Sequence, residues 1–64
     1  MIRVNGVERA EGFDSVATMM SLMAIEPKGV AVAVNGEVIG RGEWLSTSIQ
    51  DGDVVEIVNA VAGG

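Results

Sequence analysis

Two short runs of alternating apolar and polar residues begin the chain on either side of an Asn-Gly pair. Residues 2–4 and 7–10 flank Asn5 and Gly6, and this dipeptide tolerates the positive φ angles of a two-residue type I′ turn. The pattern predicts a β-hairpin.

An apolar stripe at helical spacing follows the hairpin. Its members, at i, i+3, i+4 and i+7, are Val16, Met19, Met20 and Met23. This spacing is typical of a helix with one buried face. Asp14 or Ser15 is placed to cap its first turn, and Pro27 and Gly29 end it. Because methionine fills irregular core space, we interpret the stripe as core packing rather than as a pliable binding groove.

The second half of the chain predicts three more strands. Residues 30–34 alternate valine with alanine, so one face of this strand is bulky and the other is flat and apolar. Asn35-Gly36 is a second tight-turn signal before residues 37–39. Residues 54–58 form the last strand.

Two connections complete the predicted organisation. Residues 43–49 are interpreted as a link with one helical turn, anchored in the core by Trp44, Leu45 and Ile49. Asp51-Gly52-Asp53 is a turn, because Gly52 supplies a positive φ and the aspartates can bond nearby amides. The element order predicts an α+β fold in which one helix packs on one face of a mixed sheet.

Length and composition narrow the function classes. A chain of 64 residues is expected to form a single domain, residues 1–64, with little surface for a deep pocket. It has no Cys and no His, which removes thiol catalysis, imidazole bases and the usual zinc ligands. We expect a cytoplasmic protein, since no secretory signal or membrane span is recognisable.

Charge argues against nucleic acid as a partner. Four basic and nine acidic residues give a net charge of −5, which repels a phosphate backbone. The acidic surface suits either steering toward a basic protein patch or simple solubility. No phosphate loop or calcium loop is present, and no metal site is expected.

The last two residues, Gly63 and Gly64, remain as candidate chemistry. Glycine is about 7% of average composition, so two terminal glycines occur by chance in roughly half a per cent of proteins. Without Cβ atoms, they can thread a channel too narrow for side chains and bring the terminal carboxylate to a partner's reactive centre. The alternative is an inert tail. Residues 60–64 are expected to be a flexible C-terminal tail in either case.

The chain resembles the ThiS family of ubiquitin-like sulfur carriers, which is related to MoaD. The resemblance is carried by residues 30–39, Arg41, Glu43, Trp44, residues 50–57 and the ending 60–64. It implies a β-grasp fold, with a mixed sheet of four to five strands and one main helix packed across one face.

The resemblance also implies a function in thiamine biosynthesis. An adenylating enzyme of the ThiF/E1 type would use ATP and Mg²⁺ to activate Gly64, and a sulfur donor protein would convert it to a thiocarboxylate. The carrier would then deliver sulfur to thiazole synthase, with Val61, Ala62 and Gly63 in the partner's channel. The chain would be a protein co-substrate without a bound cofactor, not an enzyme.

Three other functions remain open from the sequence. A MoaD-like carrier would pass sulfur to molybdopterin, and a ubiquitin-like modifier would attach Gly64 to lysines of target proteins. A plain interaction module would have no use for Gly63 and Gly64.

Overall fold

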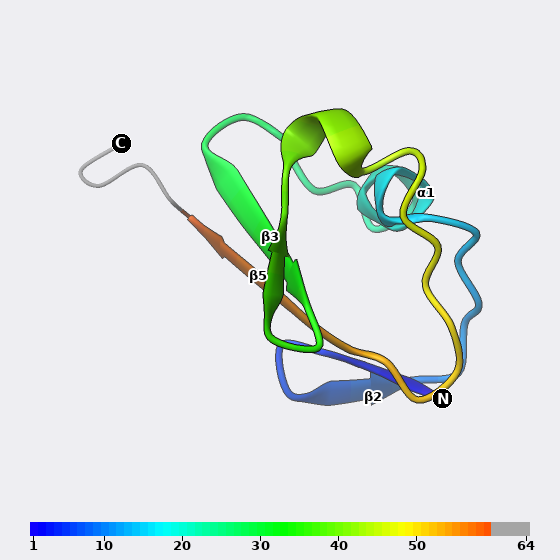
Figure 1. Ribbon diagram of the computed structural model, residues 1–64. Helices are drawn as coiled ribbons and strands as arrows, with labels where there is room; N and C mark the ends of the chain where they lie inside the picture. Colours follow the sequence, from blue (N-terminus) through cyan, green and yellow to red (C-terminus); the bar gives the residue numbers. More distant parts are fainter. Residues whose placement is uncertain (60–64) are drawn as a thin grey trace.

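One sheet and one α-helix make up the part of the chain that is described, residues 1–59 of a computed structural model (Figure 1). The elements in chain order are β1 (Ile2–Val4), β2 (Val7–Arg9), α1 (Val16–Leu22), β3 (Val30–Val34), β4 (Glu37–Ile39), the 3₁₀ helix η1 (Arg41–Glu43) and β5 (Val54–Asn59). The predicted tail, residues 60–64, lies outside the described residues.

The sheet is mixed and, within residues 1–59, has five strands in the order β2-β1-β5-β3-β4. Strand β5 pairs in parallel with β1 and antiparallel with β3, while β1–β2 and β3–β4 are antiparallel hairpins. The last strand of the chain is therefore central in the sheet. The prediction of an α+β fold with a mixed sheet is confirmed.

Both predicted Asn-Gly turns are present, and both residues of each turn have positive φ. The φ angles are 51° and 83° at Asn5 and Gly6, and 53° and 84° at Asn35 and Gly36. Two consecutive positive φ angles define the type I′ turn, whose twist matches that of the flanking strands. Each hairpin is thus specified by its local sequence.

Helix α1 begins at a serine cap and buries the predicted stripe. Of the two candidate caps, Ser15 is the one used: its Oγ accepts a hydrogen bond from the Thr18 amide at 3.1 Å. The Val16 and Met19 side chains are fully buried and Met20 is 3% exposed. Met23, the C-cap residue, is only partly buried against the core. The helix ends at Leu22, before the predicted stop at Pro27 and Gly29. The interpretation of the stripe as core packing is confirmed for its first three members.

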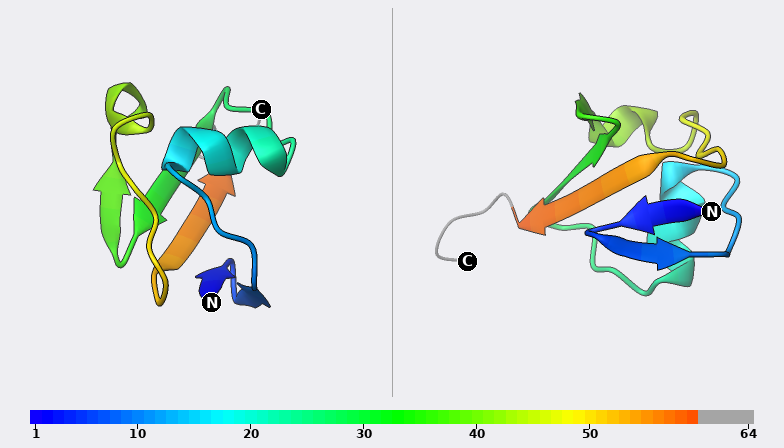
Figure 2. Two further views of the ribbon diagram at one scale, coloured as in Figure 1. Left: turned by 90° about the vertical axis from the view of Figure 1, so that its right-hand side faces the viewer. Right: turned by 90° about the horizontal axis from the view of Figure 1, so that it is seen from below.

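The core lies between α1 and one face of the sheet, which α1 crosses in Figure 2. Val32 and Val55 supply the centre of the sheet side and have no exposed surface. Around them pack Ile2, Val4, Phe13, Trp44 and Ile49. No helix within residues 1–59 has the length and apolar character needed to cross a membrane.

One predicted core anchor is wrong. Leu45 is 79% exposed, whereas its neighbour Trp44 is 6% exposed. The indole Nε1–H of Trp44 donates to the Ile39 carbonyl oxygen at 3.0 Å, which fixes the ring inside the molecule. Neighbouring residues in a helical turn point in different directions, so burying Trp44 turns Leu45 toward solvent.

Candidate functional site

Strand β5 is the element that leads to the candidate tail. Its pairing with β3 runs from Val34–Val55 to Val30–Asn59, which covers most of the strand. Its parallel pairing with β1 has only two residue pairs and stops at Val4–Val55. By strand pairing alone, the second half of β5 would therefore be held on one side only.

The side chain of Asn5 supplies the missing contacts on the other side. Its backbone amide donates to the Val55 carbonyl oxygen at 2.9 Å. Its side-chain Nδ2 donates to the Ile57 carbonyl oxygen at 3.1 Å, and its Oδ1 accepts from the Ile57 amide at 2.7 Å. A side-chain amide has both a donor and an acceptor, so it can replace a backbone peptide in a ladder. Asn5 thus extends the β1–β5 pairing toward residue 59.

A second asparagine holds the beginning of the same strand. The Oδ1 of Asn35 accepts from the Val54 amide at 2.9 Å, and its Nδ2 donates to the Asp53 carboxylate at 3.0 Å. The other Asp53 oxygen accepts from the Gln50 amide at 2.8 Å. Both halves of β5 are therefore fixed by turn residues of the two hairpins.

Sequence reasoning identified these asparagines only as turn residues. The Asn-Gly pattern predicts backbone geometry, and it carries no signal for a partner about 20 to 50 positions away. The contacts of Asn5 with Ile57 span 52 positions and those of Asn35 with Val54 span 19. Only the folded sheet brings them together.

The sheet face opposite α1 carries small and apolar residues around one charged side chain, that of Glu56 on the central strand β5, which pairs with Ala33 of β3. The alternation in β3 places Ala31 and Ala33 on this face, as expected, beside Val58 and Val38 of the neighbouring strands. Val58 is 57% exposed and Val38 is 70% exposed. Exposed apolar residues gathered on one face are typical of a contact surface.

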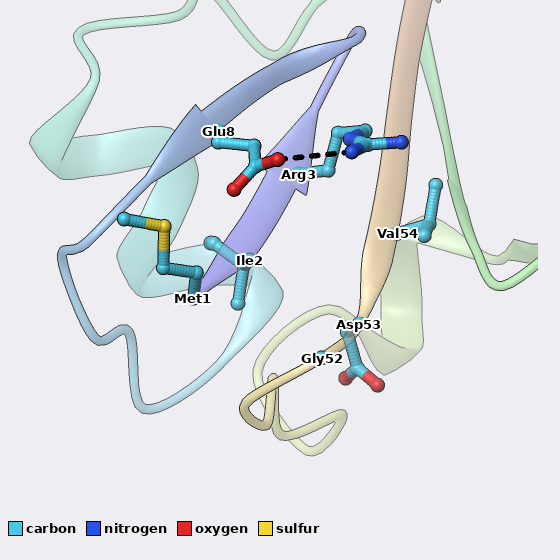
Figure 3. A pocket seen from close by; sticks show the side chains of 7 residues that line it. All are labelled: Met1, Ile2, Arg3, Glu8, Gly52, Asp53 and Val54. Atoms are coloured by element: carbon cyan, nitrogen blue, oxygen red, sulfur yellow. Dashed lines mark hydrogen bonds and ion pairs between the residues drawn. The ribbon is translucent and has the colours of Figure 1, made fainter.

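A small pocket of about 250 Å³ lies between the first hairpin and the Asp51–Asp53 turn (Figure 3). Its Arg3 guanidinium and Glu8 carboxylate form an ion pair at 3.0 Å, and both side chains are more than half exposed. Such an exposed pair is screened by water and contributes little to stability. No group of three or more potential metal ligands occurs within residues 1–59.

A second exposed ion pair joins Arg9 and Glu11. Two hydrogen bonds, of 2.8 and 2.7 Å, join the guanidinium to the carboxylate. Hydrogen bonding by Arg9 lowers the pKa of Glu11, and the same contact raises the pKa of Arg9. This pair lies at the end of β2, the edge strand, which is not paired with β5.

The predicted site residues themselves are not among those described. Val61, Ala62, Gly63 and Gly64 all follow residue 59, so their roles stay predictions. The described residues include the fixed strand β5, and the chain continues from this strand to residues 61–64.

Comparison with known proteins identifies the family. A model of the ThiS family matches residues 2–64. The sulfur carrier protein ThiS of Thermus thermophilus is 36% identical over 64 residues, and that of Bacillus subtilis is 32% identical over 66, each match covering 100% of both chains. The crystal structure of a thiamine biosynthesis protein (ThiS) from Geobacter metallireducens superposes with a TM-score of 0.83 at 31% identity, covering 98% of this chain and 97% of that one. The resemblance and the β-grasp fold expected from it are thus confirmed, and the chain belongs to the ThiS family.

Proposed function

We propose that this protein is a sulfur carrier of thiamine biosynthesis that works through the terminal carboxylate of Gly64. The observation that carries the proposal is the family match over residues 2–64, which includes both final glycines. The full-length relatives from Thermus and Bacillus are themselves named sulfur carrier proteins. The chain acts as a protein co-substrate of its partner enzymes rather than as a catalyst.

The proposed chemistry begins with activation of the carboxylate. A carboxylate oxygen of Gly64 attacks the α-phosphorus of ATP in an adenylating enzyme of the ThiF/E1 type, forming an acyl-adenylate and releasing pyrophosphate. Mg²⁺ held by that enzyme neutralises the phosphates. The terminal sulfur of a persulfide on the donor protein then attacks the acyl carbon and AMP leaves, which gives an acyl disulfide between Gly64 and the donor. A thiol attacks the donor's sulfur in that S–S bond, so the donor leaves as a disulfide with this thiol and Gly64 is left as a thiocarboxylate. This species donates sulfur for thiazole formation in thiazole synthase.

Glycine suits the last two positions for a steric reason. An adenylating centre must exclude water from the acyl-adenylate, so the channel leading to it has to be narrow. Gly63 has no Cβ to obstruct such a channel, and Val61 and Ala62 carry only small apolar side chains into it. The asparagine contacts on β5 support the proposal because they fix the base of this segment.

The alternative function as a MoaD-like sulfur carrier would use the same chemistry and would differ in the molecule that accepts the sulfur. A MoaD-like carrier would serve molybdopterin, and the ThiS family match favours thiazole instead. Attachment of Gly64 to lysines would instead give high-mass conjugates in cells, and an inert tail would make Gly63 and Gly64 dispensable.

Deletion of Gly64 tests the proposal directly. The shortened chain should keep its fold and lose pyrophosphate release with the adenylating partner, because the carboxylate no longer reaches the α-phosphorus. A matched control is Gly12→Ala, since an added Cβ at this position meets no atom within 4 Å. Normal activation of the shortened chain would refute the assignment of Gly64.

An extension by one alanine beyond Gly64 provides a second variant. It keeps every native residue and moves the carboxylate by one residue, so activation should again be lost. An extended, unprocessed chain that restores growth without thiamine would contradict the proposal.

A further inference from the structure

A groove of about 460 Å³ lies between α1 and the segment around η1. Its apolar lining includes Met20, Ile25, Pro27 and Trp44, and among residues 1–59 the only charged lining group is Arg41. In Figure 1, η1 is the yellow-green coil beside α1. The volume is within the range of ligand-binding clefts, which are mostly apolar with a few placed polar groups.

Hydrogen bonds join the two sides of the groove. The α1 amides of Val16 and Ala17 donate to the carbonyl oxygens of Thr47 and Trp44 at 3.0 and 3.1 Å. The Trp44 ring is also held by its hydrogen bond to Ile39. Because these contacts join the two sides, the groove is present before any ligand arrives, which reduces the entropy lost on binding.

Arg41 stands out from the other arginines of the chain. Arg3 pairs with Glu8 and Arg9 with Glu11, but Arg41 forms no ion pair with any carboxylate in residues 1–59. This is unexpected in a chain where acidic residues outnumber basic ones by nine to four.

The Arg41 guanidinium instead lies over the Trp44 ring, with its central carbon 5.8 Å from the ring centroid. Stacking of this kind orients the guanidinium while leaving its N–H donors available at the edge. Those donors match the two oxygens of a carboxylate.

We propose that this groove binds a segment of a partner protein in which a bulky apolar side chain stands next to a carboxylate. The apolar side chain occupies the Met20–Ile25 floor, and the carboxylate pairs with Arg41. The groove lies on the α1 side of the sheet, so it is separate from the exposed Val38–Val58 face. The inference concerns a second contact surface and does not depend on the fate of Gly64.

The test is a chemical-shift titration of the ¹⁵N-labelled full chain with two probes. The first is N-acetyl-leucyl-phenylalanine, which has a free carboxylate, and the second is its C-terminal amide. The net charge of −5 disfavours the anionic probe overall, so a preference for it has to come from a local cation. We expect saturable shifts at Ala17, Ser21, Ile25 and the Trp44 indole, with the amide binding roughly 1.5-fold to fivefold more weakly, the range for an exposed ion pair.

Two pairs of variants make the test specific. Arg41→Gln removes the charge and should abolish the preference for the carboxylate, while Arg9→Gln removes a distant charge and should not. Ser21→Tyr places a ring in the groove from an exposed helix position and should block both probes. Leu22→Tyr adds the same ring at a neighbouring position, 69% exposed in the native chain, that does not line the groove, and it should leave binding unchanged.

Three results would overturn the proposal. The first is no saturable shift, or shifts centred on Val38 and Val58 instead of the groove. The second is equal affinity for the two probes. The third is a change in the chemical shifts of the groove residues without any probe. Such a change on deletion of residues 60–64 would assign the groove to the chain's own end, and a change on dilution would assign it to a second copy of the chain.

Discussion

Replacing Asn5 by aspartate tests whether the side-chain amide holds the second half of β5. Asn5→Asp keeps the shape of the side chain and the acceptor for the Ile57 amide, but it removes the Nδ2 donor to the Ile57 carbonyl oxygen. A carboxylate oxygen then faces that carbonyl where the native distance is 3.1 Å. The substitution therefore exchanges one hydrogen bond for a repulsion and changes little else.

The expected loss is modest because the contact is exposed. Leaving an acceptor unpaired costs about 1–3 kcal/mol, and water access to the Ile57 carbonyl favours the lower end, about 1 kcal/mol. For a domain of this size, that loss lowers Tm by roughly 4–8 °C. At acid pH the introduced carboxyl becomes protonated and can donate again, so the loss should shrink as the pH falls.

The assay is thermal and urea unfolding followed by fluorescence of Trp44, the only tryptophan. Hydrogen exchange of the Ile57 amide gives a local readout, since this amide donates to Asn5 Oδ1 in the native chain. Asn5→Gly is the matched variant: it accepts the positive φ of 51° and lacks both side-chain contacts. Unchanged unfolding and unchanged exchange in both variants would refute the role assigned to Asn5.

Three further predictions concern the cap, the connection and an ion pair. Ser15→Ala should reduce the unfolding free energy by about 1 kcal/mol because the Thr18 amide loses its partner, and urea unfolding that shows no loss would contradict the cap. Trp44→Ala should cost about 3–5 kcal/mol, whereas the exposed Leu45→Ala should change the unfolding free energy by less than about 0.5 kcal/mol; a large loss in the second variant would reverse the core assignment. Arg9→Gln should raise the pKa of Glu11 toward its ordinary value in a ¹³C NMR titration, and an unchanged pKa would show that the pair does not form in solution. Because the folded-state pKa of Glu11 is lowered, any stability from this pair is present above the ordinary carboxyl pKa and is lost as the pH falls through the lowered value.

Local features were predictable from the sequence because each one depends on a few neighbouring residues. The two Asn-Gly turns, a helix cap at Asp14 or Ser15 and the helical stripe follow from φ preferences, hydrogen bonding of a free amide and side-chain periodicity. The mixed character of the sheet was also predicted, and the β-grasp arrangement came from the family resemblance.

Long-range features could not be predicted in the same way. The central position of β5 depends on pairing with β1 across about 50 residues, and the Asn5–Ile57 contact depends on that pairing in turn. The outward turn of Leu45 and the stacking of Arg41 on Trp44 follow from how the connection packs on α1. Apolar residue type alone does not distinguish Leu45 from Trp44 as a core anchor.

The central claim is that Gly64 carries sulfur, and intact mass spectrometry of the protein from its native cells tests it most directly. Cells grown under demand for thiamine synthesis should yield a C-terminal peptide in which sulfur replaces one oxygen, giving a thiocarboxylate at Gly64. A C-terminal peptide found only as the unmodified carboxylate under the same demand would contradict the claim.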